Sequence, residues 1–200
     1  TSADGTKATA SSEGSVAGLT QVKQLLSSGS AGWGADLPAG SAADAFGQGQ
    51  AAMVIETESL VKTLADAYSG VSYKVVELPA GSGGKGTLQF PTFYGVVEAS
   101  KHKADAIKLV EYLTAAERQV ALASAAGTVP AGKAAGETWK GKHADQAAFQ
   151  VGVEYSQPVP SASGTSDIIA NFDNELPGLA GGDPAGILNS AQVNLQAVLS

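Results

Sequence analysis

Two glutamates and a serine are the side chains of this sequence best placed for polar chemistry. Glu56 and Glu58 stand two residues apart, directly after the apolar run Ala51–Ile55, and Ser59 follows them. Carboxylates at this spacing share one face of an extended chain, where they can accept hydrogen bonds from the hydroxyls of a ligand. A solvated strand end is the alternative, and the spacing alone leaves both open.

The residue types that enzymes and metal centres need are scarce or scattered. The chain has no cysteine, which excludes thiolate chemistry and Cys-based metal sites. Its histidines, His102 and His143, are far apart and flanked by lysines, so we expect both to face solvent. Glycosidase carboxyl groups work across a cleft from different elements, unlike Glu56 and Glu58. We therefore predict no catalytic residue, no metal and no cofactor.

A glycine-rich loop, residues 81–86, spells G-x-G-x-x-G after a predicted strand. That pattern binds a dinucleotide only when a helix follows, because the helix N-terminus faces the pyrophosphate. Here Thr87–Phe90 reads as extended, and Lys85 is followed by Gly86 rather than by Ser or Thr, which also excludes a P-loop. We expect a mobile surface loop.

The charge and composition of the chain bear on which kinds of partner it can bind. Nineteen acidic and 12 basic residues give a net charge of −7, and no stretch gathers lysine and arginine, so nucleic acid is not expected as a partner. No apolar run approaches the roughly 20 residues of a membrane helix. The first residues lack a signal peptide and a starting Met, so we expect a mature or truncated product.

Hydrophobic periodicity predicts alternating helices and strands, and hence an α/β class. A buried strand is expected at Ala51–Ile55, a further strand at Val71–Leu78, and two short ones within Leu88–Glu98. Helices are expected after Ser12, from Ser41, from Leu60, from Ser100, after a capping box at Thr114 and Glu117, from about Thr165, and after Asp183-Pro184. The interval Thr128–Tyr155 reads as turn-like, and Trp33 and Trp139 are expected to be local packing anchors.

Several motifs occur in the order typical of one family. The run Phe46–Ile55 resembles the F-x-x-G-x-A-A-M signature of bacterial extracellular solute-binding proteins, the group that includes maltodextrin-binding proteins. Val75–Pro79 resembles that family's strand ending in LP, and Gly95–Thr114 resembles its strand, Ser-Lys-x-Lys and helix passage. Gly127 with Pro130 resembles its G-x-x-P turn, and Gly181–Leu199 its terminal helix.

The resemblance implies a periplasmic-binding-protein-like fold of type II, in which two lobes are joined by hinge crossings and only the later part is present here. Residues 1–76 would belong to the second lobe, 77–143 to the first, and 144–200 to the second again. It also implies a monomeric, non-enzymatic component of an ABC importer, held outside the cytoplasm as a cell-surface lipoprotein or in the periplasm. By lobe closure it would deliver a sugar or small oligosaccharide to the permease. A glycoside-acting enzyme and a non-catalytic interaction module remain as alternatives.

The site implied by the resemblance is poor in aromatic rings. Relatives place a ring after the Met strand, where this chain has Glu56–Ser59, and others after P-x-x-P, where it has Ser161–Asp167. The predicted ligand-binding residues are Glu56, Glu58, Ser59, Thr92, Phe93, Tyr94, Ser163 and Asp167. We expect Glu58 and Tyr94 to line one cleft from opposite lobes.

Overall fold

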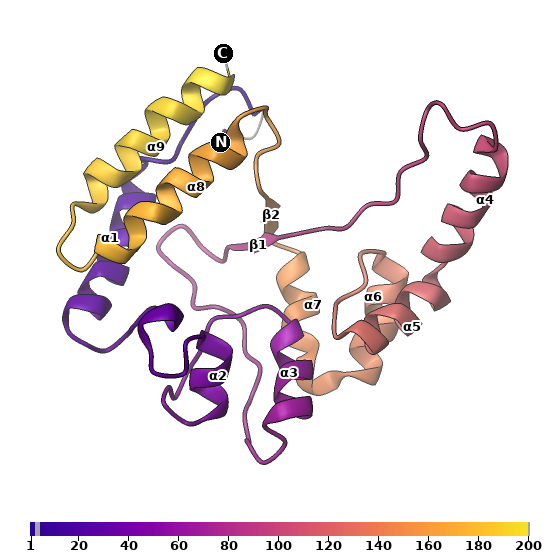
Figure 1. The fold of residues 1–200 in the computed structure, drawn as a ribbon, viewed down its shortest axis with the longest axis horizontal. Helices are drawn as coiled ribbons and strands as arrows, with labels where there is room; N and C mark the ends of the chain where they lie inside the picture. The colour runs from indigo at the N-terminus through magenta and orange to yellow at the C-terminus, as the bar shows by residue number, and fades with distance from the viewer. Residues whose placement is uncertain (3–4, 200) are drawn as a thin grey trace. The chain divides into compact units, whose positions relative to one another are not determined.

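The computed structural model describes residues 1–2 and 5–199, and its chain divides into two compact units (Figure 1). Unit 1 comprises Thr1–Ser41, Ala80–Gly84 and Val159–Ser200. Unit 2 comprises Ala42–Pro79 and Lys85–Pro158. The chain therefore passes between the units several times along its length.

Unit 1 is built from helices. They are α1 (Glu13–Ser27), α8 (Thr165–Glu175) and α9 (Pro184–Leu199), with short 3₁₀ turns η1 (Gly34–Asp36) and η3 (Leu176–Gly178). Helix α9 packs against both α1 and α8 (Figure 1). Ser12 caps α1 by accepting a hydrogen bond from the Ser15 amide at 3.3 Å, and Gly29 follows its end with φ +72°. These three helices confirm the sequence prediction.

Unit 2 combines six helices with a small sheet in the described part of the chain. The helices are α2 (Ala42–Gly47), α3 (Ser59–Ala67), α4 (Lys103–Thr114), α5 (Ala116–Ala126), α6 (Lys133–Lys142) and α7 (Ala147–Val153), with the 3₁₀ turn η2 (Ala144–Gln146). Strands β1 (Thr87–Gln89) and β2 (Ser156–Pro158) pair in parallel, with Thr87 opposite Ser156. The helix-rich chain with its parallel pair is consistent with the predicted α/β class.

The core of unit 2 lies between α5 and α6. Val120, Ala123, Ala135 and Trp139 are all buried there, and Val129 packs against them. The Trp139 side chain is 2% exposed, so the prediction that it anchors the packing is confirmed. Apolar burial of this kind, rather than helix propensity, accounts for most of the stability of such short helices.

The two strands predicted from the apolar runs are wrong for the described chain. Ala51–Ile55 and Val71–Leu78 form no strand, and Met53, Ile55 and Val76 are 87%, 78% and 74% exposed. The physical reason is that a strand needs a hydrogen-bonded neighbour, and the described residues place none beside either run. Within Leu88–Glu98 only the first residues pair, as part of β1.

The region from residue 100 to residue 155 is more helical than predicted. Helices α6 and α7 occupy the interval interpreted as turn-like. Helix α4 begins at Lys103 rather than at Ser100. The capping box is also wrong, because α5 has Ala115 at its N-cap and the Thr114 hydroxyl donates instead to the Val110 carbonyl at 2.8 Å.

The two histidines, His102 and His143, differ in their exposure to solvent. His102 is exposed, as predicted. His143 is half-buried, because its ring stacks on Trp139 with centroids 4.8 Å apart, and its Nε2 lies 3.0 Å from the Ser124 hydroxyl. The prediction that His143 faces solvent is therefore wrong, and the ring extends the core of unit 2.

Two glycines in unit 2 are expected to respond differently to substitution by alanine. A Cβ at Gly47 would lie 2.4 Å from the ring of Tyr68, which is held by a 2.8 Å hydrogen bond from its hydroxyl to Asp44. A Cβ at Gly136 would lie 2.4 Å from the Gln150 amide nitrogen, the free end of a flexible side chain. We expect Gly47→Ala to lower the free energy of unfolding by about 1–3 kcal/mol.

Gly136→Ala is the matched control, because the Gln150 amide can rotate away and alanine favours a helix interior by about 1 kcal/mol over glycine. Its stability should stay within about 1 kcal/mol of the parent. Urea unfolding followed by circular dichroism measures both variants. Equal losses would show that the Tyr68 ring is not held as described.

Candidate functional site

The acidic residues Glu56 and Glu58, which follow the apolar run Ala51–Ile55, lie at the start of α3. The Glu56 carboxylate accepts a 2.9 Å hydrogen bond from the Thr57 amide, and the Thr57 and Ser59 hydroxyls lie 2.7 Å apart. Glu58 is the half-buried N-cap residue of α3, and its side chain makes no capping hydrogen bond. The segment thus offers hydroxyls and carboxylates to a polar ligand, ahead of a helix rather than at a strand end.

The predicted turn residues Thr92, Phe93 and Tyr94 follow β1 in an extended segment. All three are exposed, Phe93 by 82% and Tyr94 by 49%. Rings exposed to this degree can pack against the apolar face of a ligand. These residues lie in unit 2 with Glu56, Glu58 and Ser59.

Ser163 and Asp167 lie in unit 1 instead. Ser163 precedes α8, and Asp167 is in its first turn; both are exposed. A carboxylate in a first turn is favoured by the helix dipole and keeps its oxygens available to solvent or ligand. The structure thus groups six of the predicted residues in one unit and two in the other, and a shared cleft stays a prediction.

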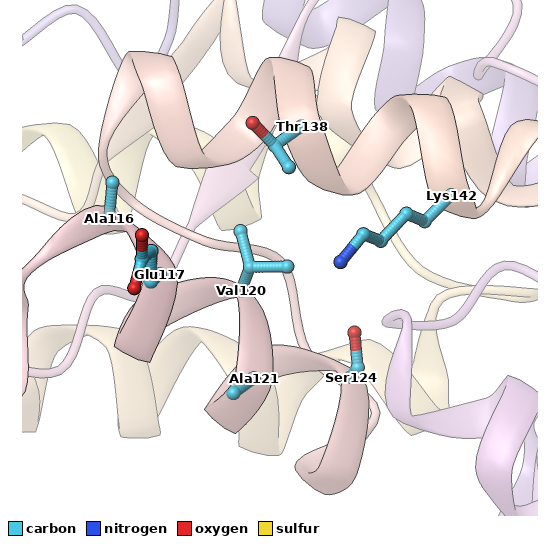
Figure 2. Close-up of a pocket in the computed structure, with 7 residues that line it drawn as sticks. All are labelled: Ala116, Glu117, Val120, Ala121, Ser124, Thr138 and Lys142. Atoms are coloured by element: carbon cyan, nitrogen blue, oxygen red, sulfur yellow. The ribbon is translucent and has the colours of Figure 1, made fainter.

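Two hollows in unit 2 are lined by residues outside the predicted binding site. The first has a volume of about 340 Å³ and lies between α5 and α6 (Figure 2). Its lining residues are Ala116, Glu117, Val120, Ala121, Ser124, Thr138 and Lys142. Figure 2 shows the Lys142 amine reaching into the hollow above Ser124, with Glu117 on the opposite side. Opposite charges around an apolar floor suit a small polar molecule.

The second hollow runs along the extended residues Val71–Val75 and has a volume of about 490 Å³. Ala144 and Asp145 close its other side. Burial, and then the charge of Asp145, raise the pKa of Tyr73, so its hydroxyl stays protonated and can donate. The Tyr73 ring packs edge-on to Phe46, with centroids 6.4 Å apart.

A third polar feature joins three segments of unit 2 at one carboxylate. Glu77 Oε2 accepts hydrogen bonds from Lys85 Nζ at 2.6 Å and from the Tyr155 hydroxyl at 2.9 Å. The ammonium group also lies 5.5 Å from the centre of the Tyr155 ring. We call these three residues the Glu77 cluster.

The electrostatics of the Glu77 cluster favour its charged form. The hydrogen bond from Lys85, and then that from Tyr155, lower the pKa of Glu77. The hydrogen bond to Glu77 raises the pKa of Lys85, while burial and then Glu77 raise that of Tyr155. At neutral pH the carboxylate and the ammonium are both ionised and the phenol keeps its proton. The sequence signal for this cluster is the pair of opposite charges, Glu77 and Lys85, on either side of residues 81–84.

The glycine-rich loop does not have the surroundings of a nucleotide site. Gly81 and Gly84 form a tight turn with two backbone hydrogen bonds of 3.1 and 3.0 Å. Strand β1 follows at Thr87, so no helix N-terminus comes next. The extended conformation predicted for the residues after this loop is therefore confirmed.

Among residues 1–2 and 5–199, no group of three or more acidic or histidine side chains is arranged to hold a metal ion. In the same residues, none of the helices combines the length and apolar character needed to cross a bilayer.

The described chain combines helices with a small parallel sheet, which is consistent with an α/β protein. A family model described as bacterial extracellular solute-binding protein matches residues 1–150. That match spans three quarters of the 200 residues, so the chain belongs to this family. No curated protein matches it.

Family membership gives the chain its general role. It is a solute-binding component of a transporter, it acts outside the cytoplasm, and it binds a small molecule and interacts with other transporter components. Proteins of this family are generally non-catalytic. The resemblance seen at Phe46–Ile55 is thus confirmed at the level of the family.

Proposed function

We propose that this chain captures a sugar or small oligosaccharide outside the cytoplasm and delivers it to the permease of an ABC importer. The observation that carries the proposal is the family match over residues 1–150. The choice of a sugar is supported by the side chains at the predicted site. Carboxylates accept hydrogen bonds from sugar hydroxyls, and side-chain hydroxyls both accept and donate them. The exposed rings of Phe93 and Tyr94 suit the apolar face of a sugar.

In this proposal the eight predicted residues contact the sugar in different ways, according to the chemistry of each side chain. Glu56, Glu58 and Asp167 accept hydrogen bonds from sugar hydroxyls, because a carboxylate has several acceptor positions. Ser59, Thr92 and Ser163 both donate and accept. Few stacking rings and many polar groups favour a small sugar over a long maltodextrin.

We further propose that the chain is the later part of a longer two-lobed protein of type II, with lobe segments at residues 1–76, 77–143 and 144–200. The exposed apolar runs around Met53, Ile55 and Val76 support this, because they have strand-like sequences and stand without a paired neighbour in the described chain. Strands from the remainder of the protein would cover them. A monomer anchored as a lipoprotein, or free in the periplasm, completes the proposal.

A glycoside-acting enzyme is the main alternative. It would need a carboxyl group whose pKa is raised so that it can protonate the leaving oxygen. At Glu77 the shift is in the opposite direction, since its pKa is lowered by Lys85 and Tyr155. An interaction module would bind no small molecule.

A thermal-shift screen of mono- and disaccharides against the full-length secreted protein tests the function. A sugar present at a hundredfold its dissociation constant should stabilise the protein by about 2.7 kcal/mol and so raise its melting temperature by several degrees. Amino acids and short peptides form the control panel. A shift with an amino acid and none with any sugar would contradict the proposal, and turnover of the bound sugar, followed by NMR, would favour the enzyme.

A further inference from the structure

The hollow between α5 and α6 carries two opposite charges that do not pair with other side chains. Glu117 is in the first turn of α5 and Lys142 is the last residue of α6, and both line the hollow (Figure 2). In the described part of the chain, neither charged group makes an ion pair or a hydrogen bond. By contrast, Lys140 on the same helix α6 pairs with Glu137 at 2.9 Å. Each unpaired charge is therefore available to a ligand group of the opposite charge.

Apolar side chains lie between the two charges. Val120 is 5% exposed, and Ala116 and Ala121 line the same hollow from α5. Figure 2 shows Val120 between Glu117 on one side and the Lys142 amine on the other. An apolar surface between two charges suits the methylene chain of a ligand that is charged at both ends.

The Lys142 end of the hollow has a second polar group. Ser124 lines the hollow there, and its hydroxyl lies 3.0 Å from His143 Nε2. The His143 ring in turn stacks on the buried Trp139, with centroids 4.8 Å apart, which holds it in place. A hydroxyl has one donor and two acceptor positions, so Ser124 keeps the capacity for a further hydrogen bond. An ammonium group and a hydroxyl together suit a carboxylate.

The spacing of the two ends sets the length of the ligand. Glu117 and Ser124 are about two turns apart on α5, which is about 10 Å along the axis at a rise of about 1.5 Å per residue. A contact of about 3 Å at each end leaves roughly 4–5 Å between the two charges of the ligand. An α-amino acid carries both charged groups on one carbon and is too short, whereas a chain of about three to five methylene groups spans the gap.

We propose that this hollow binds a small ω-amino acid. The ammonium group of the ligand pairs with Glu117, and its carboxylate pairs with Lys142 and Ser124. The hollow, of about 340 Å³, has room for such a molecule. Its charged walls are exposed, so water screens them, and we expect a dissociation constant in about the millimolar range. The inference goes beyond the proposed function, because none of these residues belongs to the predicted sugar site.

A series of ligands of increasing length, titrated into the full chain, tests the inference. We expect γ-aminobutyrate and δ-aminovalerate to bind about tenfold more tightly than glycine, which is too short, and than butyrate or butylamine, which carry one charge each. Titration followed by NMR measures the affinity through the ring protons of His143, assigned with His143→Gln, because that ring contacts Ser124. His102, exposed at the start of α4, is the internal reference and should not shift.

Matched variants locate the bound molecule. Glu117→Gln and Lys142→Met each remove one of the two charges and should weaken the binding of γ-aminobutyrate by about tenfold or more. Glu137→Gln and Lys133→Met remove exposed charges elsewhere on α6 and should keep the affinity within about twofold of the parent. Circular dichroism of each variant checks that it is folded.

Equal affinity across the length series would overturn the inference. So would undiminished binding by both Glu117→Gln and Lys142→Met, or the absence of any shift of the His143 signals with every ligand of the series. Failure of the protein to bind sugar would leave this result untouched, because the titrations contain no sugar. A thermal shift that Lys142→Met abolishes belongs to this hollow and not to the sugar site.

Discussion

Replacement of Trp139 by alanine is expected to lower the stability of unit 2 by about 3–5 kcal/mol, the usual cost of removing a buried aromatic side chain. Trp139 is 2% exposed and packs with Val120, Ala123 and Ala135 between α5 and α6. The substitution also removes the ring on which His143 stacks. With a stability of about 5–15 kcal/mol typical of a native protein, such a loss is a large share of the total.

The measurement is urea unfolding followed by circular dichroism, with Trp33→Ala as the control. Trp33 lies in unit 1 and is half-buried, at the N-cap of the short turn η1. Its removal should cost less than half as much, because less apolar surface is returned to water. If both variants lost the same stability, Trp139 would not be the main anchor of its core.

The helices that the sequence predicted well carry their own start and stop signals. Ser12 and Gly29 bound α1, and Asp183 accepts a 3.1 Å hydrogen bond from the Ala185 amide at the start of α9. Such signals act within one turn of the chain, so they can be found without knowing the tertiary structure. Helix α6 lacks a side-chain cap and contains two glycines, and it was missed.

The strands were predicted less well because their formation depends on neighbours. The runs at Met53 and Val76 have the composition of buried strands, but composition does not supply the hydrogen-bonding partner that a strand requires. In the described chain neither run forms a strand, and Met53, Ile55 and Val76 are exposed. The apolar pattern of these two segments therefore indicates that they would form strands if a neighbouring strand were present.

In the candidate site, too, groups of residues that are close in sequence were predictable, whereas groups of residues that are far apart were not. The acidic group at Glu56 and Glu58 was visible because its residues are adjacent in sequence. The Glu77 cluster was not, because Tyr155 reaches Glu77 only after the fold brings β1 and β2 together. The stacking of His143 on Trp139 spans four positions, and would have been predictable had α6 been recognised.

Removal of a carboxylate from the predicted site is expected to weaken solute binding by tenfold or more. A sugar hydroxyl that loses its buried partner is left unpaired at a cost of about 1–3 kcal/mol, and 1.4 kcal/mol corresponds to a factor of ten in affinity. Glu58→Ala and Asp167→Ala in the full-length protein test this in the two units separately. Asp173→Ala is the matched control, since Asp173 is an exposed carboxylate on the same helix, α8, outside the predicted site.

Tyr94→Leu distinguishes hydrogen bonding from stacking as the main source of affinity. Leucine keeps apolar bulk where the 49% exposed ring of Tyr94 stands, but removes its hydroxyl and its flat face. If hydrogen bonds dominate, this variant should lose less affinity than either carboxylate variant, because stacking contributes only about 0.5–1.5 kcal/mol beyond area burial. Calorimetric titration of the variants with the sugar that gives the largest thermal shift measures the order. A loss for Tyr94→Leu greater than both carboxylate losses would show that an aromatic platform governs the site.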